Sequence, residues 1–307
     1  MNYASIFREA LLITIDYRKM WLARLHRLEG LLIGFFIYLF VATTMKGFEI
    51  IFDFNFVLSI GAFYMLGASV NMLNQILDRE ADKLSTPKIP NTRNILKEVS
   101  LKNATIHLLV TTLALIILLI IIGNKAVLTL FAIGYLIAYI YSAKPLRIKG
   151  IPLLGILANS YGGMLLPLVI YFLFGANFEI TLLLVVVMFF TWMMMFIVNE
   201  MLDYTADKKY GDKTTALFLG IKKSAWLAFI FSLSVCVCLI LLTFLYNFVI
   251  LILIGNVLFT GELFKLTRNA NDKYLRKILP KMALYSLPFY MIYLIILGVP
   301  HLLKLFL

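Results

Sequence analysis

The feature that most constrains the fold is a series of nine apolar runs, each long enough to cross a lipid bilayer as a helix. A hydrocarbon core about 30 Å thick needs about 20 mostly apolar helical residues. Hydrophobic residues make up 62% of the chain, well above the roughly 45–50% of a soluble domain. The sequence therefore predicts an all-α integral membrane protein with nine transmembrane helices. The runs lie at residues 28–46, 54–76, 104–123, 125–142, 151–174, 179–201, 223–245, 247–264 and 282–303.

The basic residues predict how the helices are oriented. Of the 28 Lys and Arg residues, 25 fall on one face if the runs alternate, and the other face has only Lys46, Lys125 and Lys304. Cytoplasmic loops carry the excess of Lys and Arg, so we expect the basic face to be cytoplasmic and the protein to lie in the cell membrane. The net charge of +12 then indicates contact with anionic lipids and an anionic substrate, and it excludes nucleic acid as the partner. We expect residues 1–27 to form an amphipathic segment at this interface, followed by one polytopic domain over 28–307.

A ten-residue pattern occurs twice, at the basic ends of the second and sixth runs. Residues 74–83 read NQILDREADK and residues 199–208 read NEMLDYTADK. A spacing of four places such residues on one helix face. The equivalent positions of the two copies predict two pseudo-repeated four-helix blocks plus a ninth helix, with a site between the halves. The polar residues of the first copy are Asn74, Asp78 and Asp82, and those of the second are Asn199, Asp203 and Asp207.

These side chains have the chemistry of a magnesium site. They offer only hard oxygen ligands, without Cys or a nearby His, and this set suits Mg²⁺ rather than zinc or copper. Four carboxylates and a bound diphosphate would balance two Mg²⁺ ions only with help from nearby Lys or Arg. The alternative is that the acids are solvated helix ends. Carboxylates at the membrane edge are costly and usually functional, and two matching copies favour the site.

Together these motifs resemble those of the UbiA superfamily of intramembrane prenyltransferases, over essentially the whole chain. The first copy is similar to the family's first aspartate-rich motif. The second copy continues through Gly211 and Thr214 as D-x-x-x-D-x-x-x-G-x-x-T, which is similar to the second motif. Residues 141–149, YSAKPLRIK, resemble the family's basic loop between the fourth and fifth helices, and residues 24–27, RLHR, resemble the segment that precedes its first helix.

The resemblance implies a function. A UbiA-type prenyltransferase transfers a prenyl group from a polyprenyl diphosphate to a small, lipophilic or aromatic acceptor within the membrane and releases diphosphate. Its metal-binding and catalytic residues would be Asp78, Asp82, Asp203 and Asp207, with Asn74 and Asn199 completing the shells of two Mg²⁺ ions. The substrate-binding residues would be Asn74, Asn199, Arg93, Lys144, Arg147, Lys208, Lys213 and Tyr141.

Two other functions stay open at this point. A membrane terpene cyclase of the same fold would act on a prenyl diphosphate alone. A transporter or lipid-binding protein built of repeats would also explain the duplication, but transporters place their sites near the membrane midplane, whereas these motifs lie at one face.

Further residues are expected to shape the interior. Small residues allow close helix approach, and aromatic rings can line a site where a carbocation forms, although packing is the commoner role of any one ring. Glu80 and Glu200 fall off the polar faces of their helices, so we expect surface charges or lysine partners. The glycines concerned are Gly30, Gly61, Gly67, Gly155, Gly162 and Gly163, and the aromatic residues are Phe63, Tyr64, Tyr135, Tyr139, Tyr161 and Trp192.

Overall fold

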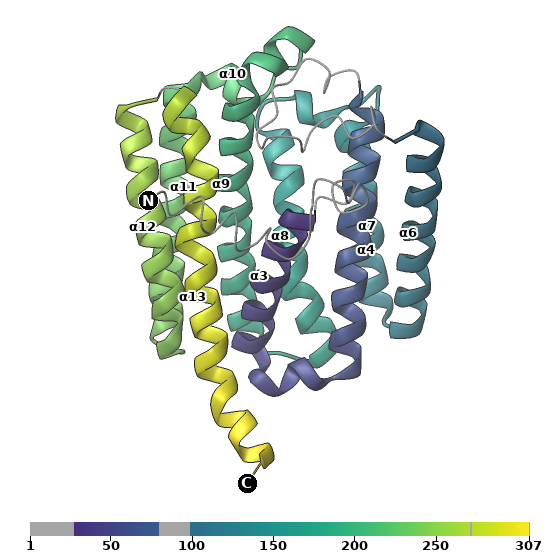
Figure 1. Cartoon of the computed structure of the whole chain (residues 1–307), viewed down its shortest axis with the longest axis vertical. Coiled ribbons are helices and arrows are strands. Elements are labelled where there is room, and N and C mark those ends of the chain that lie inside the picture. The colour runs from purple at the N-terminus through teal and green to yellow at the C-terminus, as the bar shows by residue number, and fades with distance from the viewer. Residues whose placement is uncertain (1–27, 80–98, 271, 307) are drawn as a thin grey trace.

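The computed structural model describes residues 28–79, 99–270 and 272–306. Long α-helices lie side by side in one bundle (Figure 1). Short 3₁₀ turns occur at η1 (Phe48–Phe52), η3 (Ile148–Gly150) and η4 (Asn247–Val249). The α-helices are α3 (Leu28–Lys46), α4 (Phe54–Leu77), α6 (Leu101–Ile122), α7 (Lys125–Ser142), α8 (Leu154–Phe174), α9 (Phe178–Tyr210), α10 (Thr215–Leu219), α11 (Ile221–Thr243), α12 (Ile250–Arg268) and α13 (Asp272–Phe306).

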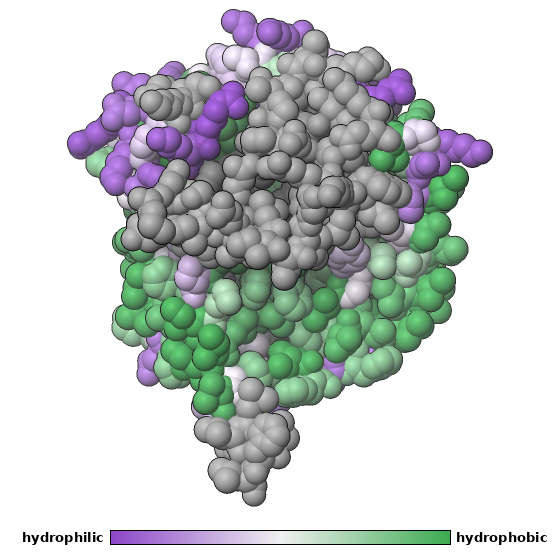
Figure 2. Space-filling model, viewed as in Figure 1, coloured by the Kyte–Doolittle hydropathy of each residue, from purple (hydrophilic) through white to green (hydrophobic). Residues whose placement is uncertain are grey.

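The bundle is a multi-span membrane protein. Among the described residues, seven helices are long and apolar enough to cross a membrane: α4, α6, α7, α8, α9, α11 and the Asn247–Arg268 stretch that contains α12. Shorter apolar helices at Leu31–Lys46 in α3 and Tyr285–Pro300 in α13 match the other two predicted runs. Figure 2 shows a green, apolar belt below hydrophilic residues at the end of the bundle that carries α10. The predicted all-helical membrane fold is confirmed.

Local sequence explains where several helices begin. The Asn124 side chain accepts a hydrogen bond from the Val127 N–H at 3.1 Å and caps α7, while Gly123 takes a left-handed φ of 66° after α6. Glycine adopts that conformation at no steric cost, so the tight connection between the third and fourth runs forms as expected. Asp53 caps α4 in the same way, accepting from the backbone N–H groups of Asn55 and Phe56.

Two helix boundaries differ from the prediction in ways that matter for the motifs. The sixth apolar run is predicted to end at residue 201, but α9 continues to Tyr210 and ends at Gly211, where φ is 91°. Asn199, Asp203 and Asp207 therefore share one continuous helix, because polar residues extend a helix beyond the apolar segment. In contrast, α4 ends at Leu77 and Asp78 is its C-cap, with φ −95° and ψ 7°.

Helices α8 and α9 pack closely against each other. A Cβ atom added at Gly163 would lie 2.7 Å from the Trp192 ring and 2.8 Å from the Met188 carbonyl oxygen. Trp192 thus fills the groove that this glycine leaves open, and its role here is packing. The pairs α4–α6 and α9–α11 also pack against each other, at equivalent places in the two predicted blocks, while α13 contacts both α12 and α3 and closes the bundle.

Candidate active site

The site is built where the end of α4, the end of α9 and the loop after α7 meet. Asp78 is 7% exposed at the end of α4. Arg147 Nη1 donates to its Oδ1 at 2.7 Å, and Lys149 Nζ lies 2.5 Å from its Oδ2. The Ser142 hydroxyl donates to the same Oδ2 at 3.2 Å and to Asn74 Oδ1 at 3.0 Å. The first polar row is therefore already in contact with two cations from the α7–α8 loop.

Arg147 joins the first row to the segment that follows the second. Its Nε and Nη2 donate to the two carboxylate oxygens of Asp212 at 3.0 and 3.1 Å, and its guanidinium lies 4.7 Å from the centre of the Tyr210 ring. Burial of the guanidinium lowers the pKa of Arg147, but the bonds and charges of Asp212 and Asp78 raise it by more, so the pKa lies above its ordinary value. The cation is permanent at any physiological pH.

The second polar row lies on α9 close to the same cations. Asp207 interacts electrostatically with Asp203, Asp212, Lys149 and Glu200. Since Lys149 also contacts Asp78, its ammonium group lies near residues of both rows. The rows therefore converge at one end of the bundle.

Tyr141 gives a second indication of this convergence. Its hydroxyl interacts electrostatically with Asp78 from the first row and with Asp207 and Glu200 from α9. The predicted substrate-binding tyrosine thus lies near residues of both rows.

Some predicted site residues lie elsewhere. Lys144, Lys208 and Lys213 have exposed side chains, and only the backbone of Lys213 takes part in the loop contacts, donating to the Gly150 carbonyl at 3.1 Å. The loop lysine that reaches Asp78 is Lys149. Four predicted features lie outside the described residues: Glu80, Asp82, Arg93 and the segment 1–27.

Sequence reasoning missed three participants: Lys149, Asp212 and the structural role of Glu200. Glu200 is not the surface charge or lysine partner that was expected, because its Oε2 accepts the Ala216 N–H at 3.0 Å and so holds the start of α10 against α9. Lys149 belongs to the basic loop that carries the family resemblance, so the sequence did indicate a loop lysine near the site. Asp212 follows the motif's Gly211, and no spacing rule indicates its partner.

The donor set fits a hard cation. Asn74, Asp78, Asn199, Asp203 and Asp207 supply only oxygen ligands of the kind that Mg²⁺ binds. The carboxylates around Asp207 also leave an excess of negative charge that a cation would offset. Within residues 28–79, 99–270 and 272–306, no three Asp, Glu, His or Cys side chains are already gathered closely enough to hold a metal ion.

The aromatic residues proposed for a cation-binding wall mostly have packing or hydrogen-bonding roles. The Phe63 ring packs against Tyr38 and Phe131, with ring centres 4.6 and 5.1 Å apart. The Tyr161 hydroxyl donates to the Leu130 carbonyl at 2.8 Å, and the Tyr135 hydroxyl bonds to Thr112 at 3.0 Å.

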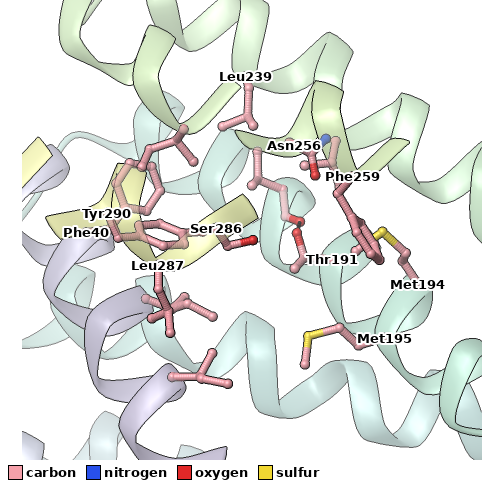
Figure 3. Close-up of a pocket in the computed structure, with 15 residues that line it drawn as sticks. Phe40, Thr191, Met194, Met195, Leu239, Asn256, Phe259, Ser286, Leu287 and Tyr290 are labelled. Atoms are coloured by element: carbon pink, nitrogen blue, oxygen red, sulfur yellow. Dashed lines mark hydrogen bonds between the residues drawn. The ribbon is translucent and has the colours of Figure 1, made fainter. Parts of the chain in front are cut away.

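A separate, mostly apolar pocket lies among α3, α9, α11, α12 and α13 (Figure 3). Phe40, Met195 and Tyr290 are among its lining residues, and Thr191, Asn256 and Ser286 supply its few polar side chains. Met195 is one helical turn before Asn199 on α9, a rise of about 6 Å. The pocket thus approaches the second polar row from the membrane interior.

Comparisons with known proteins agree on the fold. The sequence profile of the UbiA prenyltransferase family matches residues 31–297. A structure of a UbiA homolog from Archaeoglobus fulgidus bound to GPP and Mg²⁺ is 18% identical, with a TM-score of 0.64, and the match covers 89% of this chain and 99% of that one. For the same homolog bound to DMAPP and Mg²⁺, the sequence identity is 18% and the TM-score is 0.64, and the match covers 89% of this chain and 98% of that one.

A digeranylgeranylglyceryl phosphate synthase studied in membranes is 20% identical, with a TM-score of 0.63, and the match covers 92% of this chain and 99% of that one. At these identities the likeness concerns the fold. No curated protein sequence matches the chain.

Proposed function

Because the chain belongs to the UbiA prenyltransferase family, we propose that it transfers a prenyl group from a polyprenyl diphosphate to a small, lipophilic or aromatic acceptor within the membrane, releasing diphosphate. One observation supports this most strongly: the Lys149 ammonium contacts Asp78 of the first motif and lies near enough to Asp207 of the second to interact with it electrostatically. Two acidic rows close to one cation form a site of the right charge pattern for a diphosphate held through metal ions.

The oxygen-bearing residues of the two rows would hold two Mg²⁺ ions: Asn74, Asp78 and Asp82 in the first, and Asn199, Asp203 and Asp207 in the second. Bound Mg²⁺ would neutralise the diphosphate and ease its departure. The homolog structures bound to GPP or DMAPP together with Mg²⁺ support this assignment.

Arg147 and Lys149 would bind the leaving diphosphate directly. Both now donate to Asp78, so they lie beside the first row and can exchange that carboxylate for diphosphate oxygens. Donors fixed in advance at the place where negative charge develops stabilise a transition state more than mobile ones do. The exposed Lys144, Lys208 and Lys213, together with Arg93, would act on the approaching anion, and Tyr141 would orient its head group.

The prenyl tail would lie in the apolar pocket of Figure 3. Its Met195 end is one helical turn from Asn199, so a head group at the second row would leave the hydrocarbon chain directed into the pocket. A water-poor setting protects an allylic cation from hydrolysis.

We assign the site to the cytoplasmic side of the cell membrane and treat 28–307 as one polytopic domain. Lys and Arg are concentrated in the loops at the end of the bundle that carries the two rows, and such loops face the cytoplasm. The apolar segments of α3 and α13 would complete the nine spans.

The direct test is product analysis with purified protein in detergent or liposomes. Incubation with GPP, Mg²⁺ and a panel of phenolic, naphthoic and glycerol phosphate acceptors should give a prenylated product and an equal amount of diphosphate. Asp203→Ala should give neither, while Lys222→Ala, which removes an exposed lysine at the start of α11, should behave as wild type. A cyclic terpene formed from GPP without acceptor would replace this proposal with a cyclase, and diphosphate release by Asp203→Ala equal to wild type would refute the site.

A further inference from the structure

We propose that Asp212 is a positioning residue that holds the Arg147 guanidinium ready for the diphosphate. This inference rests on the proposed function. It concerns a residue outside both Asn/Asp rows: Asp212 follows Gly211, the residue that ends α9 with a φ of 91°.

The first argument is the geometry of the ion pair. Asp212 takes the Nε–Nη2 edge of the guanidinium with two nearly parallel bonds of 3.0 and 3.1 Å. A fork of this kind fixes the plane of an arginine, which a single bond does not. Nη1 is thereby directed to Asp78 at 2.7 Å and to the Ser142 carbonyl at 3.3 Å. An incoming diphosphate can compete for Nη1 while the fork with Asp212 stays intact.

The second argument is the backbone. Arg147 has φ 37° and ψ 56°, and Leu153 in the same loop has φ 64°. Such conformations are unfavourable for residues with a Cβ atom and persist only when surrounding contacts enforce them. The Asp212 fork is one of the contacts that enforce the Arg147 conformation.

The third argument is that the segment after α9 is fixed to the Arg147 loop along its length. Lys213 N–H donates to the Gly150 carbonyl at 3.1 Å, and Leu153 N–H donates to the Thr215 hydroxyl at 2.9 Å. A Cβ atom on Gly150 would lie 3.0 Å from Asp212 Oδ1, so the two segments touch at the carboxylate itself. The support for Arg147 is therefore rigid.

Charge explains why Arg147 needs a second acidic partner. Asp78 is shared with Lys149, and it is a proposed metal ligand. If a cation engaged Asp78, Arg147 would lose its bond there, but Asp212 would keep the guanidinium paired and in place. Pre-organisation of this kind is what a supporting residue contributes to a site.

The test is the affinity for a non-hydrolysable geranyl diphosphate analogue with Mg²⁺, measured calorimetrically on full-length protein in detergent. Asp212→Asn keeps the shape of the side chain and removes its charge. We expect it to weaken binding about tenfold, as loss of a charge-assisted bond does. Asp212→Glu should recover part of the affinity. The matched control is Glu179→Gln, an exposed acid at the other end of α9, which should bind as wild type.

A double-variant cycle separates positioning from general damage. Arg147→Ala should weaken binding at least as much as Asp212→Asn, and the combined variant should be no worse than Arg147→Ala alone, because the two residues act as one unit. Losses that multiply in the double variant, or wild-type affinity in Asp212→Asn, would overturn the role of Asp212 and leave the proposed function standing. Wild-type affinity in Arg147→Ala would refute the diphosphate-binding role of Arg147, and the inference would fall with it.

Discussion

Replacement of Asp78 by alanine should remove both activity and part of the protein's stability. The carboxylate is bound by Arg147 and Lys149, so its removal leaves one buried and one partly buried cation short of a partner. Deleting one member of a buried pair typically costs about 3–5 kcal/mol. Here the cost is smaller, since Asp212 still pairs with Arg147 and the Lys149 side chain is 17% exposed and can turn toward water. We expect a loss of about 2 kcal/mol.

This loss can be measured apart from catalysis. About 2 kcal/mol corresponds to a melting temperature lower by roughly 4–8 °C on the scale of a domain of 150–250 residues. Size-exclusion chromatography of heated, fluorescently tagged protein in detergent follows that shift. Because Lys149 is stranded by the change, the Asp78→Ala/Lys149→Ala double variant should lose about 1–2 kcal/mol less than the sum of the single variants.

Turnover of GPP is assayed below the lowered melting temperature. Asp78→Ala should reduce it at least about 100-fold, since loss of a mere outer-shell partner of a metal already costs about 10–100-fold. Wild-type turnover in this variant would show that the first row does not bind the diphosphate. Strictly additive stability losses would show that the Asp78–Lys149 contact carries no energy.

Three further outcomes are expected. Chelation with EDTA should stop prenyl transfer, and added Mg²⁺ should restore it; undiminished transfer in excess chelator would contradict the metal assignment. Gly163→Ala should destabilise the bundle by about 1–3 kcal/mol through overpacking, because its Cβ would lie 2.7 Å from Trp192. At Gly162 the nearest atom is 3.5 Å away, so the matched Gly162→Ala should be near neutral. Equal melting temperatures of the two variants would contradict the close α8–α9 contact. The pKa of Arg147 is raised in the fold, so the stability that its charge adds is complete below the ordinary pKa of arginine and is lost only at higher pH. The difference in melting temperature between wild type and Arg147→Ala should therefore be constant from about pH 6 to about pH 10. A difference that fades within that range would contradict a permanent cation.

The sequence alone determined which segments form long apolar helices, and it indicated the family. Helix length and apolarity are local properties, so the predicted runs 28–46 and 125–142 coincide with α3 and α7. The spacing of four within each motif is also local, and it placed Asn199, Asp203 and Asp207 on one helix. The predicted end of the sixth run at residue 201 was wrong, because it was set by the change from apolar to polar residues. Helix α9 continues to Tyr210, since a polar sequence can extend a helix beyond its apolar segment.

Tertiary structure decided which charges meet. Arg147 is 69 residues from Asp78 and 65 from Asp212, and its contacts depend on a left-handed backbone that no local pattern assigns to an arginine. Contacts between distant segments also explain why Lys149 and not Lys144 pairs with Asp78. They likewise explain why Glu200 accepts a hydrogen bond from the Ala216 N–H. Such pairings arise only when segments distant in the chain are brought to the same end of the bundle, since the energy of an ion pair depends on distance in space and not on spacing in sequence.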